Sequence, residues 1–324
     1  MSQAIHGVFN LCKPRGLTSY QVVAQVRRLA EERRVGHGGT LDPEATGVLP
    51  VCLGQATRLA EYLTELPKAY CAEVRLGVTT DTYDAAGKIT GTHSLDHVTL
   101  DEVKQALARF TGRIQQLPPM YSAVKQGGRK LYDLARAGQT VEREPRWVEI
   151  YRLDLLAWEP PYLTINVECS KGTYIRSLAH DLGQLLGCGA MLQHLVRLRS
   201  GPFTLEDSLT LDELRLAFDF GYWSKLIWAM DRIVLHWPAV IVGKEKEEAI
   251  LRGQSIDLGG DGELQGLSRA YTTDGRFAAI LRGSGGPKRW VPHKVFSAAV
   301  LPDDEERYAP GLPEPDDTES SRLS

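Results

Sequence analysis

One acidic residue, Asp42, lies in the middle of the stretch GHGGTLDPEATGVLP (residues 36–50). Glycine and proline recur in this stretch, and neither suits a helix interior or a central strand, because glycine costs entropy and proline lacks the N–H. The stretch is therefore predicted to be a shaped loop that holds a carboxylate where a bulky substrate can approach. The alternative is structural: Asp42 before Pro43 also fits a helix N-cap followed by proline at the first helical position.

The segments on either side of this loop have the patterns of regular elements. An apolar run at 8–11 predicts a short strand, residues 13–16 (KPRG) predict a turn, and residues 48–53 predict a second strand. Thr18 or Ser19 is the expected N-cap of an amphipathic helix. The apolar side of that helix carries Val22, Val23, Val26 and Leu29. These flanking elements favour the functional interpretation of Asp42 over the structural one.

Three regions follow one another along the 324 residues. The first, residues 1–232, mixes strands and helices and is predicted to be an α+β domain. The second, residues 233–301, has short apolar runs separated by Gly-rich turns, which predicts a small β-domain. The third, residues 302–324, is rich in Pro, Asp, Glu and Ser and is expected to be a disordered acidic tail. The strand-like and helical runs of the first region are 69–76, 163–169, 100–110 and 175–186.

The net charge of −3 argues against a uniformly basic, nonspecific nucleic-acid binder. The tail contributes eight acidic and two basic residues, so the rest of the chain has 36 basic and 33 acidic residues. Any RNA contact must therefore rest on local clusters, each of which is also a candidate for an ordinary solvated face. The clusters are Arg27/Arg28, Arg33/Arg34, Lys125/Arg129/Lys130, Arg143/Arg146 and Arg197/Arg199.

Several protein classes are disfavoured by what the sequence lacks. It has no run of about 18 apolar residues and no basic-then-apolar signal pattern at its N-terminus. Its five cysteines are scattered without a C-x-x-C pair, which indicates neither a disulfide framework nor a zinc site and fits a reducing cytoplasm. No G-x-G-x-x-G or P-loop follows a predicted strand, so a nucleotide cofactor is not indicated.

Five blocks of the sequence, in order, resemble one family, the bacterial tRNA pseudouridine-55 synthases (TruB family). The resemblance covers roughly residues 7–215. The blocks are the KP turn with the loop GHGGTLDPEATGVLPV, the K-x-Y of residues 68–70, the RLG-x-x-T-x-T-x-D-x-x-G of residues 75–87, LPPMYSAVKQGGRKLYDLARAG at 117–138, and CSKGTYIRSLAHDLGQLLGCGAMLQHLVRLRSG at 169–201.

The resemblance implies a catalytic domain of the pseudouridine synthase type, with a mixed or antiparallel sheet, that acts on uridine 55 in the T-loop of tRNA. The target base would be flipped out, its N1–C1′ bond broken, the base rotated, and a C5–C1′ bond formed. This isomerisation needs no redox change and no external energy, so no cofactor and no metal are expected. A weaker resemblance, at residues 253–256 (GQSI) and at the end of the second region, is to the PUA-type RNA-binding domain of bacterial members.

The resemblance also implies roles for individual residues. Asp42 is the nucleophile, and Arg176 is the ion-pair partner that keeps it ionised, since a nearby opposite charge favours a carboxylate. Tyr70 stacks on the uracil, and its hydroxyl handles a proton. Lining or neighbouring the uracil pocket are Tyr174, Leu195 and His37. Each residue has a structural alternative, as a surface arginine, a core side chain or a structural histidine. Expected on the RNA backbone are Lys125, Arg129 and Lys130, beside two glycines.

The chain departs from the family pattern at one position of the catalytic loop. Many relatives have GHTG where this chain has GHGG, with Gly38 in place of threonine. The change is expected to loosen the loop and to remove one hydroxyl. It leaves His37 and Asp42 in register, so activity is still expected.

Three other functions remain open from the sequence. A guide-RNA-dependent ribosomal-RNA synthase shares the catalytic blocks, but this chain lacks long basic extensions and carries the block at 117–128 that resembles the bacterial insertion. An RNA-folding module would use binding more than catalysis. A retaining glycosidase needs a second carboxylate about 5–5.5 Å from the first; in the matching motifs only Glu44 offers itself, and it is expected to point elsewhere.

The expected partner is tRNA, bound through its T-arm. We expect a cytoplasmic monomer with no membrane attachment and no obligate protein partner. The sequence does not choose between attack at C1′, attack at C6 and a glycal route.

Overall fold

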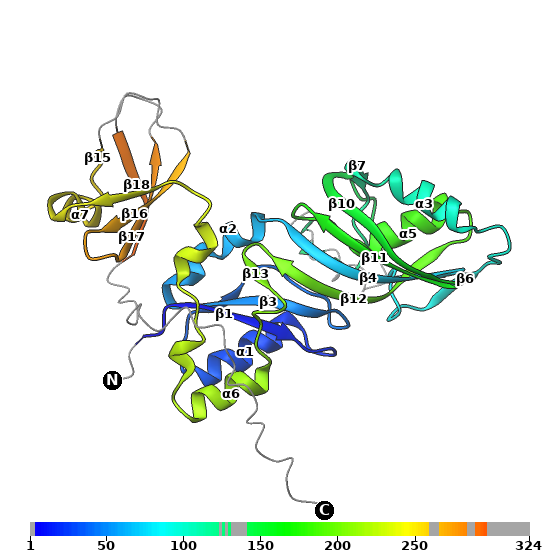
Figure 1. The fold of residues 1–324 in the computed structure, drawn as a ribbon, viewed down its shortest axis with the longest axis horizontal. Coiled ribbons are helices and arrows are strands. Elements are labelled where there is room, and N and C mark those ends of the chain that lie inside the picture. Colours follow the sequence, from blue (N-terminus) through cyan, green and yellow to red (C-terminus); the bar gives the residue numbers. More distant parts are fainter. Residues whose placement is uncertain are drawn as a thin grey trace, which may run out of the picture. The chain divides into compact units, whose positions relative to one another are not determined.

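The computed structural model describes residues 4–122, 125–126, 129–130, 141–258, 266–283 and 289–296. The chain forms two units (Figure 1). The larger unit consists of Met1–Asp219 with Trp228–Trp237, and the smaller unit consists of Phe220–Ile227 with Pro238–Ser324. In the described part of the chain, no helix has the length and apolar character needed to cross a membrane.

A nine-stranded sheet forms the centre of the larger unit, in the order β1-β3-β12-β4-β11-β10-β7, with β2 paired to β3 and β13 to β12. Its pairs are antiparallel except for β12 and β3, which run parallel, so the sheet is mixed and the predicted α+β class is confirmed. The strands are β1 Gly7–Lys13, β2 Val35–His37, β3 Thr46–Leu53, β4 Lys68–Leu76, β7 Gly112–Gln116, β10 Arg146–Glu159, β11 Tyr162–Cys169, β12 Ala190–Ser200 and β13 Phe203–Thr204.

Helices pack against both ends and the middle of this sheet. Figure 1 shows α1 and α6 beside β1, whereas α3 contacts β10 and α5 packs against β12 and β4. The helices and 3₁₀ turns are α1 Ser19–Leu29, η1 Gly54–Leu59, α2 Ala60–Glu65, α3 Leu100–Ala108, α5 Ile175–Leu185, α6 Leu211–Asp219 and η3 Met230–Val234. The strand-like and helical runs predicted around the catalytic blocks are therefore present.

The first helix shows why the local sequence folds as it does. Thr18 is the N-cap of α1, and with Gln21 it forms a capping box in which each side chain bonds the other residue's backbone N–H. Of the four apolar residues expected on its inner face, Val22, Val23 and Val26 are buried. The helix is thereby anchored next to the loop that carries Asp42.

The main core of the larger unit lies between β4, β11, β12 and α5. Fully buried side chains from these elements include Val74, Ile165, Leu178 and Leu182. Burying side chains of this size contributes about 1.5–3 kcal/mol each. Such packing fixes β4, β12 and the start of α5 relative to one another.

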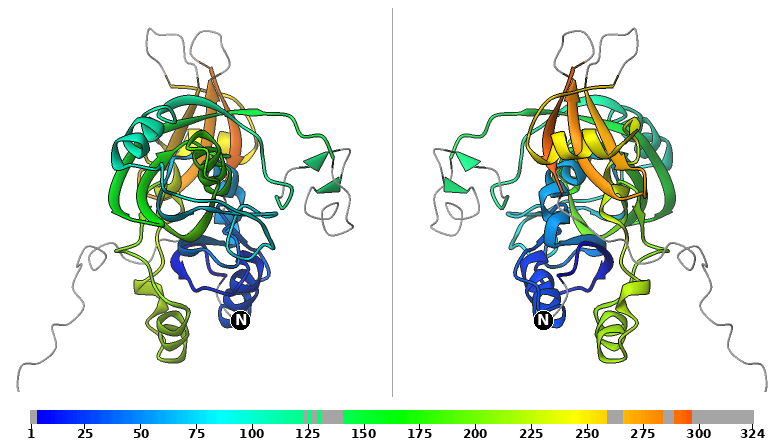
Figure 2. Two further views of the ribbon diagram at one scale, coloured as in Figure 1. Left: turned by 90° about the vertical axis from the view of Figure 1, so that its right-hand side faces the viewer. Right: turned by 90° about the vertical axis from the view of Figure 1, so that its left-hand side faces the viewer.

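Two short hairpins complete the larger unit. The first joins β5 Val78–Thr80 and β6 Ile89–Thr92. The second joins β8 Lys125–Gln126 and β9 Arg129–Lys130, and Figure 2 shows it apart from the nine-stranded sheet.

The smaller unit has a five-stranded sheet in the order β14-β16-β17-β18-β15. Its core includes Val242, Ile250, Ala279 and Leu281, so the predicted small β-domain is confirmed. Spatial grouping changes at Trp237/Pro238, and our division after residue 232 stays a prediction. The predicted tail, 302–324, lies outside the described residues. The elements are β14 Ala239–Val242, β15 Ile256–Asp257, β16 Leu267–Thr272, β17 Phe277–Gly283, β18 Arg289–Val295, α7 Lys244–Leu251 and η2 Trp223–Lys225.

Candidate active site

Asp42 lies in the loop between β2 and β3. The backbone N–H of Ala45 donates to the carbonyl of Asp42 at 3.1 Å, and the chain then enters β3 rather than a helix. The alternative of an N-cap aspartate is therefore wrong. The Asp42 side chain remains 42% exposed, which leaves the carboxylate open to a substrate.

Arg176, near the start of α5, binds the Asp42 carboxylate with two nitrogens. Its Nε lies 3.0 Å from Oδ2, and its Nη2 donates to Oδ1 at 3.2 Å. The Arg176 side chain is only 6% exposed, and its Nη2 also donates to the carbonyl of Tyr121 at 2.8 Å. Such a two-pronged pair fixes the orientation of the carboxylate as well as stabilising its charge. The predicted partnership of Asp42 and Arg176 is thus present.

A second carboxylate shares the same guanidinium. Asp84 Oδ2 lies 3.5 Å from Nη1 of Arg176, and Nη1 also donates to the carbonyl of Thr82 at 3.3 Å. Asp84 is held in place by the hydroxyl of Thr82 at 2.6 Å and by the backbone N–H of Ala86 at 3.1 Å. Sequence reasoning gave Asp84 no role, although it is the aspartate of the T-x-T-x-D motif that signalled the family.

The expectation that only Glu44 offers a second acidic group near Asp42 was therefore wrong, because Asp84 also binds Arg176. Glu44 itself points elsewhere, as expected: it forms an exposed ion pair with Arg15 at 2.7 Å.

Burial and the nearby positive charges shift the pKa of Asp42 in opposite directions. Partial burial raises the pKa of its carboxyl above the ordinary value, and the Asp84 carboxylate raises it further. Arg176 and, more weakly, Lys13 lower the pKa. Arg176 is therefore the main group that favours the ionised form of Asp42.

Tyr70 and Arg197 form a directly opposed pair on the neighbouring strands β4 and β12. Burial raises the pKa of the Tyr70 hydroxyl, whereas the adjacent Arg197 guanidinium lowers it. The Asp42 carboxylate is close enough to raise the pKa of Tyr70 as well. Tyr70 packs against the main core, and its hydroxyl lies close to the Arg197 guanidinium.

Arg197 is only 1% exposed, and its guanidinium binds backbone carbonyls on both sides of Asp42 in the sequence. Its Nε donates to the carbonyl of Val48 at 2.6 Å, and its Nη2 donates to the carbonyl of Gly39 at 3.2 Å. The hypothesis that Arg197 and Arg199 form an RNA-facing cluster is wrong, because Arg197 is internal and Arg199 pairs with Glu168. Its position beside the K-x-Y strand was not visible in a single sequence.

Lys13 and Ser19 hold the other side of the same loop. The Lys13 ammonium, fully buried, donates to the carbonyls of Leu17 at 2.6 Å and Pro43 at 3.0 Å. Burial lowers the pKa of Lys13 to about 8, against the influence of Asp42 and Glu44. The Ser19 hydroxyl accepts from the backbone N–H of Leu41 and donates to the carbonyl of Leu41, the residue that directly precedes Asp42. Asp42 is thus flanked by backbone that side chains fix on both sides.

The remaining candidates lie around this centre. Tyr174 is the N-cap residue of α5, and its backbone N–H donates to the Gln116 side chain at 3.0 Å. Burial raises the pKa of its hydroxyl. Leu195 is partly buried against the main core, opposite Ala72 of β4. Their lining of a uracil pocket stays a prediction.

His37 ends β2, and its Nδ1 accepts from the backbone N–H of Gly39 at 3.3 Å. Burial and then the Arg197 charge lower the pKa of His37, which favours a neutral imidazole at pH 7. The side chains of Lys125, Arg129 and Lys130 lie outside the described part of the chain.

Two loop glycines are required by close packing. A Cβ at Gly38 would lie 2.1 Å from Cδ2 of the buried Leu63. At Gly47, which has a φ of +97°, a Cβ would lie 2.3 Å from the carbonyl oxygen of Arg197. Gly38 therefore makes room for Leu63, and the expected loosening of the loop stays a prediction.

The fold and this site define the class of protein. The model of the TruB family pseudouridylate synthase N-terminal domain matches residues 27–175, and that of the tRNA pseudouridylate synthase B C-terminal domain matches residues 176–234. The chain is thus a pseudouridine synthase. It belongs to the TruB family, as its resemblance in sequence predicted.

Its relatives include two bacterial proteins named tRNA pseudouridine synthase B. The protein of Dehalococcoides mccartyi is 46% identical over 90% of this chain and 97% of its own length. The protein of Pseudomonas aeruginosa is 44% identical over 86% of this chain and 92% of its own length.

Solved structures of the same fold are more distant in sequence. A structure titled as a Cbf5-Nop10-Gar1 complex gives a TM-score of 0.71 at 31% identity, covering 90% of this chain and 84% of that one. A structure of an H/ACA RNP bound to a substrate RNA gives a TM-score of 0.69 at 28% identity, covering 91% and 86%. These likenesses agree with the mixed sheet described above.

Proposed function

We propose that this enzyme, a tRNA pseudouridine synthase, isomerises uridine 55 in the T-loop of tRNA by means of Asp42. One observation carries the proposal: a partly exposed carboxylate, in a loop fixed on both sides, is bound through two nitrogens by a buried arginine. The names of the bacterial relatives support tRNA as the substrate class.

The chemistry accounts for each of these features. Exchange of the N1–C1′ bond for a C5–C1′ bond needs a carboxylate near the sugar or the base, and it leaves the overall composition of the nucleotide unchanged. Arg176 keeps the Asp42 carboxylate ionised and fixes its orientation, while the Asp84 carboxylate pairs with Nη1 of the same guanidinium. Attack at C1′, attack at C6 and a glycal route all make use of the same carboxylate.

The target uridine must leave its stack before Asp42 can reach it. Extruding a base costs roughly a few kcal/mol, which contacts with the flipped uracil offset. In this proposal the ring of Tyr70 stacks on the uracil, Tyr174 and Leu195 line its pocket, and His37 lies beside the nucleotide. Burial raises the pKa of the Tyr70 hydroxyl, so this group holds its proton at pH 7. In the proposal the hydroxyl also handles a proton during the reaction.

Recognition of the rest of the RNA is also part of the proposal. Phosphates of the T-arm are bound by Lys125, Arg129 and Lys130. The β-domain acts as a PUA-like RNA-binding module. The enzyme acts in the cytoplasm as a monomer, with tRNA as its partner and no obligate protein partner. Identity of 43–46% to bacterial tRNA enzymes, against 27–31% to the Cbf5 structures, supports this over guide-dependent modification of ribosomal RNA.

The test is to map pseudouridine at single-nucleotide resolution in RNA from cells with and without this chain. Loss of pseudouridine at position 55 of tRNAs, with ribosomal RNA unchanged, is the expected result. Retention of pseudouridine 55, or a loss confined to ribosomal RNA, would overturn the proposal.

A further inference from the structure

The turn at residues 13–16 is tied to the catalytic loop. The backbone N–H of Gly16 donates to the carbonyl of Pro43 at 2.8 Å, and the Lys13 ammonium donates to the same carbonyl at 3.0 Å. The Asp42 carboxylate raises the pKa of Lys13, so it lies near this ammonium. The turn therefore forms one side of the active site.

An exposed ion pair joins the same two segments. Nε of Arg15, in the turn, lies 2.7 Å from Oε2 of Glu44, which follows Asp42 by two positions. The Arg15 side chain is 57% exposed and the Glu44 side chain is 47% exposed. Glu44 also raises the pKa of Lys13, so the pair lies on the side of the site where that ammonium is buried. Water and salt screen such a pair, and its partners are easily exchanged.

Other cations at the site are directed into the protein. Arg176 binds two carboxylates and the carbonyls of two further residues. Arg197 donates to carbonyls of the catalytic loop, and the Lys13 ammonium donates to three carbonyls. All three side chains are buried. Arg15 differs from them because solvent, and therefore a substrate, can reach its guanidinium.

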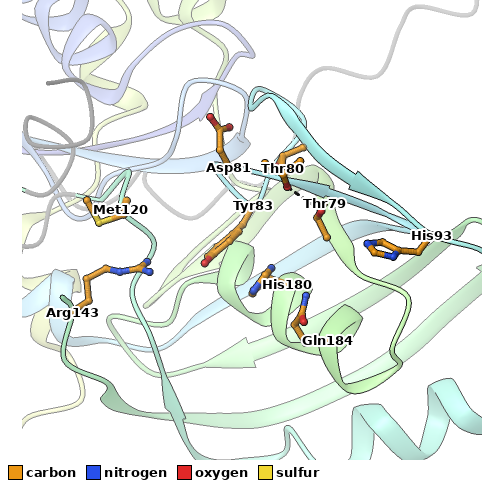
Figure 3. Close-up of a pocket in the computed structure, with 10 residues that line it drawn as sticks. Thr79, Thr80, Asp81, Tyr83, His93, Met120, Arg143, His180 and Gln184 are labelled. Atoms are coloured by element: carbon orange, nitrogen blue, oxygen red, sulfur yellow. Dashed lines mark hydrogen bonds between the residues drawn. The ribbon is translucent and has the colours of Figure 1, made fainter. Parts of the chain in front are cut away.

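Arg15 is also separate from the cavity of about 390 Å³ that adjoins the site at α5. Figure 3 shows Arg143 and His180 among the residues that line this cavity. Among the described residues, those of the turn at 13–16 do not line it. A group that binds Arg15 would therefore lie outside the cavity, at the rim formed by the turn and the catalytic loop.

A uridine that reaches Asp42 brings phosphate groups to this rim. The phosphates on its 5′ and 3′ sides are each attached to the ribose whose C1′ takes part in the reaction. A guanidinium suits phosphate because its planar N–H donors match the phosphate oxygens and its charge is permanent. Each phosphate that is neutralised also releases counterions from the RNA, a gain that the screened pair with Glu44 lacks. Exchange of Glu44 for phosphate is therefore favourable.

We propose that Arg15 leaves Glu44 when RNA binds and holds one of the two phosphates that flank the target uridine. This inference rests on the proposed function, because it requires the uridine to reach Asp42. Arg15 then strengthens RNA binding, whereas Glu44 weakens it by competing for the guanidinium. The two residues should act with opposite sign, in contrast to a purely structural pair, which is lost equally when either partner is replaced.

The test measures the affinity of T-arm RNA for Arg15→Gln and Glu44→Gln over a range of salt concentrations. Arg15→Gln should bind about tenfold more weakly, the low end for a hydrogen bond to a charged group. Its slope of log affinity against log salt should be smaller by about 0.7–0.9, the value for one phosphate contact. Glu44→Gln should bind about 1.4- to fivefold more tightly, because it removes an exposed competing pair.

T-arm RNAs with a neutral methylphosphonate at one linkage at a time identify the phosphate, each compared with RNA that has the same ribose modification and an ordinary linkage. At the linkage that Arg15 holds, Arg15→Gln should cause no further loss of affinity, whereas the loss should persist at the other linkages. Arg215→Gln and Asp212→Asn each break an exposed ion pair of 2.8 Å on α6. They are the matched controls and should bind every RNA like the unmodified enzyme.

Unchanged affinity and salt slope for Arg15→Gln would overturn the inference. Equal losses for Arg15→Gln and Glu44→Gln would also overturn it and make the pair a structural link, as would the same loss with every methylphosphonate RNA. The proposed function is scored separately, by whether the unmodified enzyme forms pseudouridine in the intact T-arm. An enzyme that does so while Arg15→Gln shows no coupling to any linkage refutes only the phosphate contact.

Discussion

Replacing Arg176 with methionine should move the acid limb of the pH–rate profile to higher pH. The reasoning requires Asp42 to be ionised in order to react, so activity rises as pH increases through the pKa of that carboxyl. Arg176 lowers this pKa, whereas burial and Asp84 raise it. Without the guanidinium, the protonated, inactive form of Asp42 persists to higher pH.

The size of the shift follows from the contacts. An opposite charge in direct contact lowers a carboxyl pKa by roughly 1–3 units. Nε and Nη2 of Arg176 contact the Asp42 carboxylate at 3.0 and 3.2 Å. The Asp42 side chain is 42% exposed, however, so water screens part of the attraction. We therefore expect the limb to rise by about 1–2 units. At pH values well below the pKa of Asp42 in both the unmodified enzyme and Arg176→Met, a shift of this size lowers the ionised fraction of Asp42 about 10- to 100-fold.

The assay is single-turnover pseudouridine formation at saturating tRNA between pH 5 and pH 9. The ratio of unmodified to Arg176→Met rates should grow as the pH falls and level off at high pH, where only the loss of orientation remains. Asp84→Asn is the control of opposite sign: it removes a like charge, so its limb should move to lower pH. A ratio that stays constant across the range for Arg176→Met would refute the electrostatic role of Arg176.

Three further substitutions test other parts of the site. Tyr70→Phe should leave tRNA affinity unchanged and lower turnover by roughly 10²–10⁴-fold; a near-normal rate would leave Tyr70 as a stacking platform only. Arg197→Met leaves the carbonyls of Gly39 and Val48 without their donor, each at a cost of about 1–3 kcal/mol, and should lower both the urea midpoint and the single-turnover rate; unchanged stability and rate would contradict its role in holding the catalytic loop. Gly38→Ala should cost about 1–3 kcal/mol in urea unfolding, and much less when Leu63→Ala has already made room; equal costs in both backgrounds would show that Leu63 is not the obstacle.

The elements around the site were largely predictable because their signals are local. The Thr18 cap, the apolar runs of β1 and β3 and the helical spacing at 175–186 each depend on a few consecutive residues, and the structure contains all of them. The same holds for the small β-domain, whose short apolar runs became strands. The order of strands in the sheet depends on long-range pairing and did not follow from these signals.

The residues that sequence reasoning missed act across long sequence separations. The sequence suggested that Arg197 is one of a pair of surface charges. In the structure it is buried and binds the carbonyl of Val48, which lies 149 positions earlier in the chain. Asp84 lay inside a recognised motif, but its contact with Arg176 brings together segments that no local pattern connects. Gly38 appeared to be a loss of a threonine until Leu63 was seen to occupy that space. Buried polar networks of this kind are specified by tertiary packing.

The most direct measurement of the central claim uses Asp42→Asn and a tRNA labelled with tritium at C5 of uridine 55. Formation of the C5–C1′ bond displaces the hydrogen at C5, so each turnover releases tritium into water. The account predicts no release above the enzyme-free control, while tRNA affinity stays within a few-fold because phosphate contacts dominate binding. Tritium release by Asp42→Asn at a measurable rate would contradict the assignment of Asp42 as the catalytic carboxylate.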